Sequence, residues 1–327
     1  MRQVVLNQPG EFSDESAPSP SPGPDEALVR VRSIGVCGTD LHAFAGRQPF
    51  FTYPRVLGHE LGVEVLSIPE NPAGIAAGDR CSVEPYINNP ASHASQLGKT
   101  NCCEELQVMG VHVDGGMRGL FTVPVRLLHP SKKLSYEQLA LVETLGIGFH
   151  AVERSELGSG ANTLVIGAGP IGLAVVEFAN ALGANVTVLD ISPERRKFIE
   201  QRGVEAVNEI GDRRFDYVFD ATGAKASMEA SFDYCAHGAT LVFVGLIQDT
   251  ISFHDPSFHR KELTLKSSRN SAHAFPKIIR MIEEGKIDTA PWVNHRMKLS
   301  EVADDFKGLR QIPGLVKAVI EVGDEDL

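Results

Sequence analysis

The pattern of apolar and polar positions changes near residue 145. Before it, short alternating runs such as residues 27–31 (Ala-Leu-Val-Arg-Val) are separated by glycine and proline, which predicts β-strands joined by turns. The proline-rich segment 12–26 is expected to be a surface loop between early strands. From about residue 146, apolar strands alternate with amphipathic helices, and this order predicts a parallel, doubly wound α/β sheet.

Individual elements can be placed in the second part of the chain. Ser192-Pro193 predicts a helix start, because serine caps free backbone amides and proline suits the first turn. A last strand that returned to the first domain would make that domain discontinuous. We therefore predict one domain from residues 1–145 and 286–327 and a second from residues 146–285. Strands are expected at 163–166, 185–190, 217–220, 240–244 and 316–322, with helices over 171–182 and 275–284.

Composition narrows the class of protein. A chain of 327 residues is long enough for two cores. Its net charge is −11 and it has no long basic run, so we expect neither nucleic acid nor a membrane surface as partner. No secretory signal is recognisable and no apolar stretch reaches the ~18 residues of a spanning helix. Five scattered cysteines fit a reduced, cytoplasmic protein better than a disulfide framework.

A glycine-rich turn follows the first strand of the second part. It reads Gly167-Ala168-Gly169-Pro170-Ile171-Gly172 and precedes a helix, the setting in which glycines let a pyrophosphate approach the backbone. Asp190 ends the next strand, where a carboxylate can bind a ribose and repel a 2′-phosphate, so NAD is favoured; the alternative is an ordinary helix-capping aspartate. Arg195 and Arg196 leave some use of NADP open. The residues expected to line the cofactor site also include Arg195, Thr222, Val244 and Gly245.

Three segments, 35–42, 58–60 and 141–145, carry cysteine, histidine and carboxylate side chains. They supply Cys37, His59 and Glu143, with Glu60 beside His59. These are the ligand types of a catalytic zinc that keeps one open position. Singly, each has a structural explanation, as a small core residue, a loop histidine and a charge on a helix surface. Their occurrence together, ahead of a dinucleotide-binding pattern, favours the metal site.

These motifs, with residues 46–60, 255–262 and 268–270, resemble the zinc-containing medium-chain dehydrogenase/reductase family over residues 4–322. The similarity is greatest to the polyol, threonine and sugar-acid branches, including the bacterial L-galactonate 5-dehydrogenase type. The resemblance implies a chaperonin-10-like (GroES-like) β-barrel as catalytic domain and a Rossmann domain for the dinucleotide.

The resemblance also implies roles for individual residues. Cys37 and His59 match zinc ligands, and Glu143 falls at the position of the third ligand. Glu60 matches a carboxylate that sometimes replaces that ligand or binds zinc transiently, so the choice between the two glutamates stays open. Thr39 matches the hydroxyl that hydrogen-bonds the alcohol, and His42 the base that ends a proton relay.

Two departures from the family pattern are visible. Members with a structural zinc carry a C-x2-C-x2-C-x7-C lobe, whose positions here are Asn89, Ser92, Ser95 and Cys103. With three thiolates missing, we expect one catalytic zinc and no structural zinc. The second departure is a shortened stretch between residues 207 and 216, where a helix is expected to be lost.

The resemblance predicts a zinc-dependent enzyme that transfers a hydride between NAD and a secondary alcohol of a sugar acid or polyol. Positive charge from Arg47, Arg118, His259 and Arg269 would favour a sugar acid, although some of these residues can serve the surface or the cofactor. Two alternatives are a zinc-free, NADPH-dependent quinone or enone reductase of the same fold and a non-catalytic dinucleotide-binding protein.

An exposed strand edge predicts self-association. Residues 263–266 should form the edge of the second sheet, and exposed edges tend to be paired or covered. Relatives pair this edge across a twofold axis, so we expect a homodimer or a homotetramer.

Overall fold

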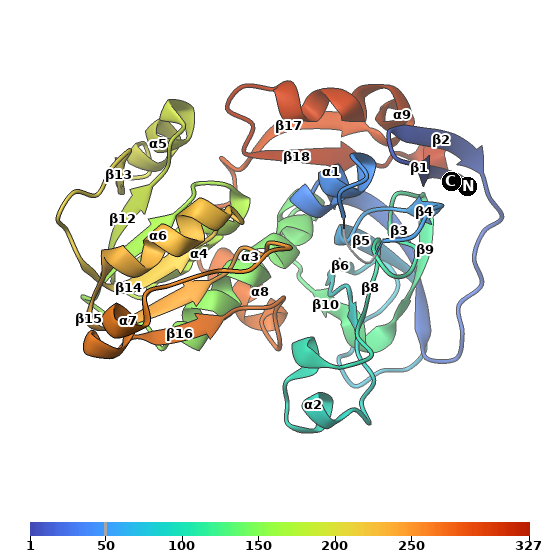
Figure 1. Ribbon diagram of the computed structural model, residues 1–327. Helices are drawn as coiled ribbons and strands as arrows, with labels where there is room; N and C mark the ends of the chain where they lie inside the picture. Colours follow the sequence, from blue (N-terminus) through green and yellow to red (C-terminus); the bar gives the residue numbers. More distant parts are fainter. Residues whose placement is uncertain (49–50) are drawn as a thin grey trace. The chain divides into compact units, whose positions relative to one another are not determined.

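The computed structural model describes residues 1–48 and 51–327 (Figure 1); Pro49 and Phe50, part of the segment 46–60 named above, lie outside the described residues. The chain divides into two compact units, Met1–Glu143 with Phe275–Leu327 and Thr144–Ala274. The second change of unit falls at α8 (Phe275–Glu283) rather than after residue 285. The reason is local, because the Phe275 ring lies 5.0 Å from that of His129 and Glu283 accepts a hydrogen bond from Ser131.

The first unit is built on a seven-stranded, mainly antiparallel sheet in the order β10-β6-β5-β3-β18-β17, with β9 also paired to β3. Smaller sheets are β2-β1-β4 and β7-β8. The strands are β1 (Arg2–Gln8), β2 (Glu11–Ser16), β3 (Glu26–Gly35), β4 (Arg55–Val56), β5 (Glu60–Ser67), β6 (Arg80–Val83), β7 (Tyr86–Ile87), β8 (Gln107–Val108), β9 (Leu120–Pro124), β10 (Leu128–Pro130), β17 (Val293–Lys298) and β18 (Lys317–Glu321). The short helices of this unit are α1 (Gly38–Phe44), α2 (His93–Gln96) and α9 (Val302–Asp305).

The segment predicted as one loop over 12–26 contains a strand. Strand β2 pairs antiparallel with β1, with Leu6 opposite Phe12, and Gly10 makes the connecting turn with φ of +79°. The Phe12 ring packs 5.4 Å from Phe44 and 5.1 Å from Phe306. The prediction was wrong for residues 12–16 because this pairing and aromatic packing outweigh the polar local sequence; residues 17–23 have no regular structure.

The last strand returns to the first unit, as predicted. Strand β18 pairs antiparallel with β3, with Ile320 opposite Ile34, and Ala318, Val319 and Ile320 are buried. This apolar run carries one charged member, Lys317, which is also buried. A buried lysine needs a partner, and that partner proves to be part of the site.

The second unit contains the predicted parallel, doubly wound sheet. Its six strands lie in the order β13-β12-β11-β14-β15-β16, and neighbouring strands pair in parallel. The strands are β11 (Asn162–Ile166), β12 (Asn185–Leu189), β13 (Glu205–Val207), β14 (Phe215–Asp220), β15 (Cys235–Phe243) and β16 (Thr264–Ser267), and the helices are α4 (Pro170–Ala181), α5 (Pro193–Glu200), α6 (Lys225–Tyr234) and α7 (Asp255–Arg260). Helix α3 (Tyr136–Ser155) connects the units along the chain.

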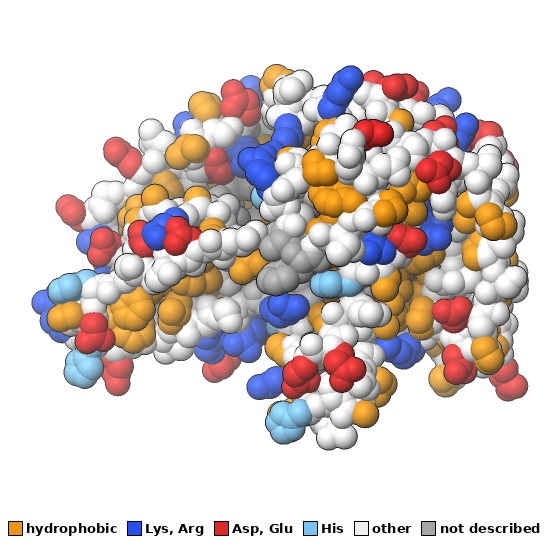
Figure 2. Space-filling view, turned by 45° about the vertical axis from the view of Figure 1, so that its right-hand side comes forward, with side chains coloured by type: hydrophobic (Ala, Val, Ile, Leu, Met, Phe, Trp, Pro, Cys, Tyr) orange, Lys and Arg blue, Asp and Glu red, His pale blue; other side chains and the backbone are white. Residues whose placement is uncertain are grey.

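Residues 208–214, between β13 and β14, contain no helix, in agreement with the shortening inferred from the sequence. Strand β16 is the edge of the sheet, as predicted. Acidic and basic side chains are interspersed over the face seen in Figure 2. Among the described residues, no helix is long and apolar enough to cross a membrane.

Candidate metal centre and cofactor site

Cys37 is held at the start of α1. It occupies the N-cap position of that helix, and the Asp40 carboxylate accepts a hydrogen bond from the Cys37 backbone N–H at 2.8 Å. The local sequence therefore fixes the backbone position from which the Cys37 sulfur projects.

His59 and Glu60 stand at the start of β5. Gly58 precedes them with φ of +93°, a conformation that glycine adopts without steric cost. Glu60 lies opposite Gly35 in the ladder between β5 and β3, and a Cβ atom at residue 35 would come within 2.0 Å of Glu60 Oε2. Gly35 thus leaves the room that this carboxylate occupies.

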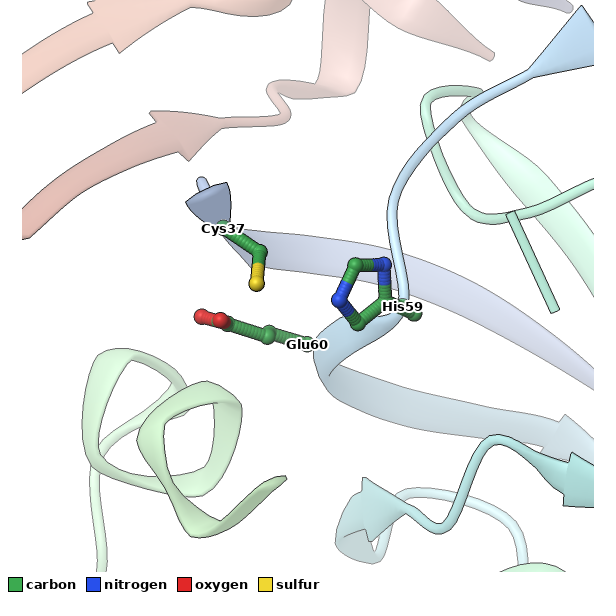
Figure 3. Close-up of side chains that lie close together, drawn as sticks. All are labelled: Cys37, His59 and Glu60. Carbon is green, nitrogen blue, oxygen red and sulfur yellow. The ribbon is translucent and has the colours of Figure 1, made fainter. Parts of the chain in front are cut away.

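The side chains of Cys37, His59 and Glu60 point toward one another (Figure 3). One ligand atom from each lies within 4.8 Å of the other two, and His59 and Glu60 are buried. Glu60 Oε1 accepts a hydrogen bond from Lys317 Nζ at 2.5 Å, whereas Oε2 is buried without a hydrogen-bond partner. A thiolate, an imidazole and an unpaired carboxylate oxygen make up a donor set that zinc prefers, so these residues fit the metal.

Asp40 supports the histidine and was not identified from the sequence. His59 Nδ1 lies 3.6 Å from Asp40 Oδ1, and Asp40 is 1% exposed. Burial raises the pKa of Asp40. Burial alone would lower the pKa of His59, but the charges of Asp40 and Cys37 raise it well above its ordinary value. His59 Nδ1 and Asp40 Oδ1 are too far apart for a hydrogen bond, and neither has a hydrogen-bond partner, so Asp40 acts on the histidine through its charge; the sequence signal was an aspartate three residues after Cys37.

Glu143 lies on α3 and is buried. Its Oε1 accepts a short hydrogen bond from the hydroxyl of Tyr86, on β7. Burial raises the pKa of Glu143, and the charge of His59 opposes the rise. Glu143 is therefore near the centre but outside the cluster of three described above, and its assignment as a zinc ligand stays a prediction.

Thr39 and His42 both lie on α1. Residues three apart on a helix share a side of it, so the two side chains can follow one another in a relay. Burial lowers the pKa of His42, and the charges of Arg310 and Arg47 lower it further. His42 is thereby favoured in its neutral form, which is the form a terminal base requires. Their proposed roles remain predictions.

The four positions at which family members with a structural zinc carry cysteine lie close together in this chain. The Cys103 sulfur accepts a hydrogen bond from the Asn89 N–H at 3.3 Å, and the Ser92 hydroxyl lies 2.9 Å from that of Ser95. Hydrogen bonds from Ser92 and Asn89 lower the pKa of Cys103, against the effect of burial. Polar side chains thus surround one thiol here, and the expected lack of a structural zinc stays a prediction.

The glycine-rich turn has the geometry that a dinucleotide requires. Gly167 has φ of +94°, and a Cβ atom at Gly172 would lie 1.7 Å from the Gly167 carbonyl oxygen. Gly169 caps α4, with Pro170 in the first turn, and Ile171 is the next residue of the helix. Free amides at this helix start can bind a phosphate.

Asp190 links this turn to the next helix. Its carboxylate accepts hydrogen bonds from the Ala168 N–H at 2.6 Å and the Ser192 N–H at 2.7 Å, and Arg195 Nη1 lies 3.9 Å away. Each carboxylate oxygen has a second lone pair, so a ribose hydroxyl could still be accepted. The N-cap of α5 is Ser192, so Asp190 is not the helix-capping residue of the alternative interpretation, and its role toward the ribose stays a prediction.

The other expected cofactor residues lie at the carboxyl ends of neighbouring strands. A Cβ atom at Gly167 would be 3.1 Å from Thr222 Cγ2. The N–H groups of Val244 and Gly245 both donate to the Asp220 carbonyl, at 2.9 and 3.0 Å. In parallel sheets, ligands bind at this edge. Ile191 follows Asp190 and is 90% exposed.

Arg118, one of the basic residues expected to favour a sugar acid, is held by contacts within the protein. Its guanidinium lies 4.8 Å from the centre of the Phe121 ring and Nε donates to the Gly115 carbonyl at 2.8 Å. Burial lowers its pKa. In the first unit, exposed Arg47 and Arg310 next to His42 are better placed to meet an anion.

Comparison with known proteins agrees with this geometry. Residues 23–133 match the family model of the alcohol dehydrogenase GroES-like domain, and residues 170–284 match that of the zinc-binding dehydrogenases. The L-galactonate-5-dehydrogenase of Escherichia coli is 38% identical over 94% of each chain.

Solved structures show the same two-unit architecture. An Escherichia coli alcohol dehydrogenase in complex with NADH superposes with a TM-score of 0.92 at 25% identity, covering 98% of this chain and 99% of that one. A zinc-binding dehydrogenase from Sinorhizobium meliloti bound to NADP gives 0.90 at 26% identity over 98% of each chain. The fold, the donor set and the comparisons lead to one conclusion: the chain belongs to the zinc-type, medium-chain alcohol dehydrogenase family.

Proposed function

We propose that the protein oxidises a secondary hydroxyl of a sugar acid, using one zinc ion and NAD. The observation that carries this proposal is the set of half-buried Cys37 and buried His59 and Glu60, whose ligand atoms lie within 4.8 Å of one another. Asp190 at the end of β12 supports NAD as the cofactor, because a carboxylate there would repel the 2′-phosphate of NADP.

Within this proposal, Cys37, His59 and Glu60 are the three protein ligands. Glu60 Oε2 is buried without a hydrogen-bond partner, whereas Glu143 Oε1 is engaged by Tyr86. Three protein ligands leave the position that a substrate oxygen needs. Lys317 neutralises part of the negative charge of Glu60, and the Asp40 carboxylate places a negative charge beside His59.

The residues of the first unit would handle the proton of the reaction. When bound, zinc would act as a Lewis acid on the substrate hydroxyl and NAD would accept the hydride. Thr39 would accept a hydrogen bond from that hydroxyl and pass the proton toward His42. Because the pKa of His42 is lowered by burial and by Arg310 and Arg47, His42 can take up the proton near neutral pH and release it to solvent.

Two observations support the proposal that the substrate carries an acid group. The Escherichia coli relative at 38% identity is named for L-galactonate, a sugar acid. Burial lowers the pKa of His42, and Arg310 and Arg47 both lie close enough to His42 for their charges to lower its pKa further. Two cations near one another favour an anion beside them.

A panel of aldonates, polyols and threonine tests the proposal. With zinc-loaded protein, NADH formation should be fastest on an aldonate, and removing zinc with a chelator should abolish it. Faster turnover of a neutral polyol or of threonine would show that the substrate is not a sugar acid. If the protein reduces enones with NADPH and the chelator does not stop the reaction, the protein is a zinc-free reductase. If it binds a dinucleotide but turns over none of the substrates, it is a non-catalytic binding protein.

We also propose that two copies pair through β16. This strand is the sheet edge, and its Leu265 side chain is 39% exposed; unpaired edges are commonly covered by a partner. Light scattering at micromolar concentration should give the mass of a dimer or a dimer of dimers, and Leu265→Lys should reduce it. A wild-type monomer would contradict the pairing.

Five free cysteines support a reducing, cytoplasmic setting.

A further inference from the structure

Two buried glutamates stand near the proposed metal centre, and each is held by a different neighbour. Lys317 donates to Glu60 Oε1, and the Tyr86 hydroxyl donates to Glu143 Oε1. The other oxygen of Glu60 is buried without a partner. Glu143 is within electrostatic reach of the centre, because the charges of His59 and Glu60 act on its pKa. The hydrogen bonds, together with the closer approach of Glu60 to Cys37 and His59, distinguish which carboxylate is free to bind a metal.

The tyrosine is in a fixed position. Tyr86 is 4% exposed and packs in a small apolar cluster with Cys103, Leu106 and Val108. Its strand pairs with β8, with Tyr86 opposite Val108. A ring buried among these neighbours and tied through its backbone cannot follow Glu143 if that carboxylate moves. The hydroxyl is therefore an anchor for the carboxylate.

We propose that Tyr86 is a positioning residue that selects the third zinc ligand. By holding Glu143 Oε1 through its hydroxyl, it keeps this carboxylate outside the ligand set and leaves the third position to Glu60. The inference rests on the proposed zinc centre and adds a specific residue that decides its composition. A buried carboxylate that loses its donor must find another positive partner, and the nearby metal would provide one.

Cobalt substitution measures the ligand set without relying on turnover, because the visible absorption of Co²⁺ depends on coordination number and geometry. Tyr86→Phe removes only the hydroxyl. Its cobalt form should show weaker visible bands, shifted as expected for an added ligand, and Tyr86→Phe/Glu143→Gln should restore the wild-type spectrum. Tyr217→Phe is the matched control, since its hydroxyl donates to the Glu156 carbonyl in the second unit and the spectrum should not change.

Glu143→Gln alone keeps the test decisive if Tyr86→Phe does not fold. It retains an oxygen that can accept from Tyr86, so its cobalt spectrum should match wild type and its zinc affinity should fall by no more than about 10–100-fold, the range for a residue that does not touch the metal. A changed spectrum, or a loss well above that range, would identify Glu143 as a ligand and overturn the inference. An unchanged spectrum in Tyr86→Phe would also overturn it. Wild-type protein that takes up neither metal would refute the zinc centre itself, which is a distinguishable result.

Discussion

Lys317→Met tests the buried ion pair beside the proposed zinc. The ammonium lies 2.5 Å from Glu60 Oε1, and both side chains are 1% exposed. With an effective dielectric constant of about 20, the attraction over that distance is roughly 7 kcal/mol. Desolvation of the lysine offsets part of it, and removing one partner of a buried pair typically costs ~3–5 kcal/mol. We expect that loss in the free energy of unfolding of chelator-treated protein.

Zinc should reduce the loss, because a cation bound by Glu60 replaces the missing positive charge. In zinc-loaded protein the expected difference is therefore smaller than in chelator-treated protein. Although burial would lower the pKa of Lys317, Glu60 raises it overall. The stabilisation by the ion pair is therefore fully present below the ordinary pKa of lysine and is lost only as the pH rises through the raised pKa of Lys317. The difference in unfolding free energy between wild type and Lys317→Met should thus be constant between about pH 6 and pH 9.

Urea unfolding followed by tryptophan fluorescence is a suitable assay. Trp292 is the single tryptophan of the chain, is buried and belongs to the first unit. Lys225→Met is the control, because Lys225 pairs with Asp249 on the surface and such pairs contribute below about 1 kcal/mol. Equal losses with and without zinc would refute the reasoning, as would a loss no larger than that of the control.

Other consequences can be measured on single variants. Asp190→Ala should weaken NAD binding by about tenfold or more and improve relative use of NADP; a wild type that already prefers NADP contradicts the ribose assignment. The acid limb of kcat/KM should lie below about pH 6.5, since activity is lost when pH falls through the lowered pKa of His42. Arg310→Ala should move that limb upward, and an unmoved limb would remove His42 from the relay. Cys103→Ala should accelerate proteolysis within residues 88–106, whereas Cys102→Ala, at an exposed position, should not. Equal rates for the two variants would show that the Cys103 sulfur does not stabilise this segment.

Much of the cofactor unit could be predicted because its signals are local. The glycine spacing at residues 167–172 reflects a turn that tolerates no Cβ atom at Gly172, and strong apolar runs mark the strands. The return of β18 was also foreseeable, because an apolar strand needs a sheet to join. By contrast, β2 depends on pairing with β1 and on packing by Phe44 and Phe306, which no local pattern encodes.

A metal centre could be proposed from the sequence, but its third ligand could not be chosen. Glu60 and Glu143 are both glutamates near ligand motifs, and the difference lies in hydrogen bonds from Lys317 and Tyr86. Those partners come from positions far along the chain. A lysine in an otherwise apolar strand was a usable signal, because a buried ammonium group requires a carboxylate. Asp40 could likewise have been inferred from its place at the start of α1.

X-ray absorption at the zinc edge of the purified, zinc-loaded protein tests the central claim most directly. A centre built from Cys37, His59 and Glu60 predicts one sulfur neighbour at about 2.3 Å and nitrogen and oxygen neighbours at about 2.0–2.2 Å, with one zinc per chain. A spectrum without a sulfur neighbour would contradict the Cys37 site. Two or more sulfur neighbours would place the metal in the lobe of Cys102 and Cys103 instead.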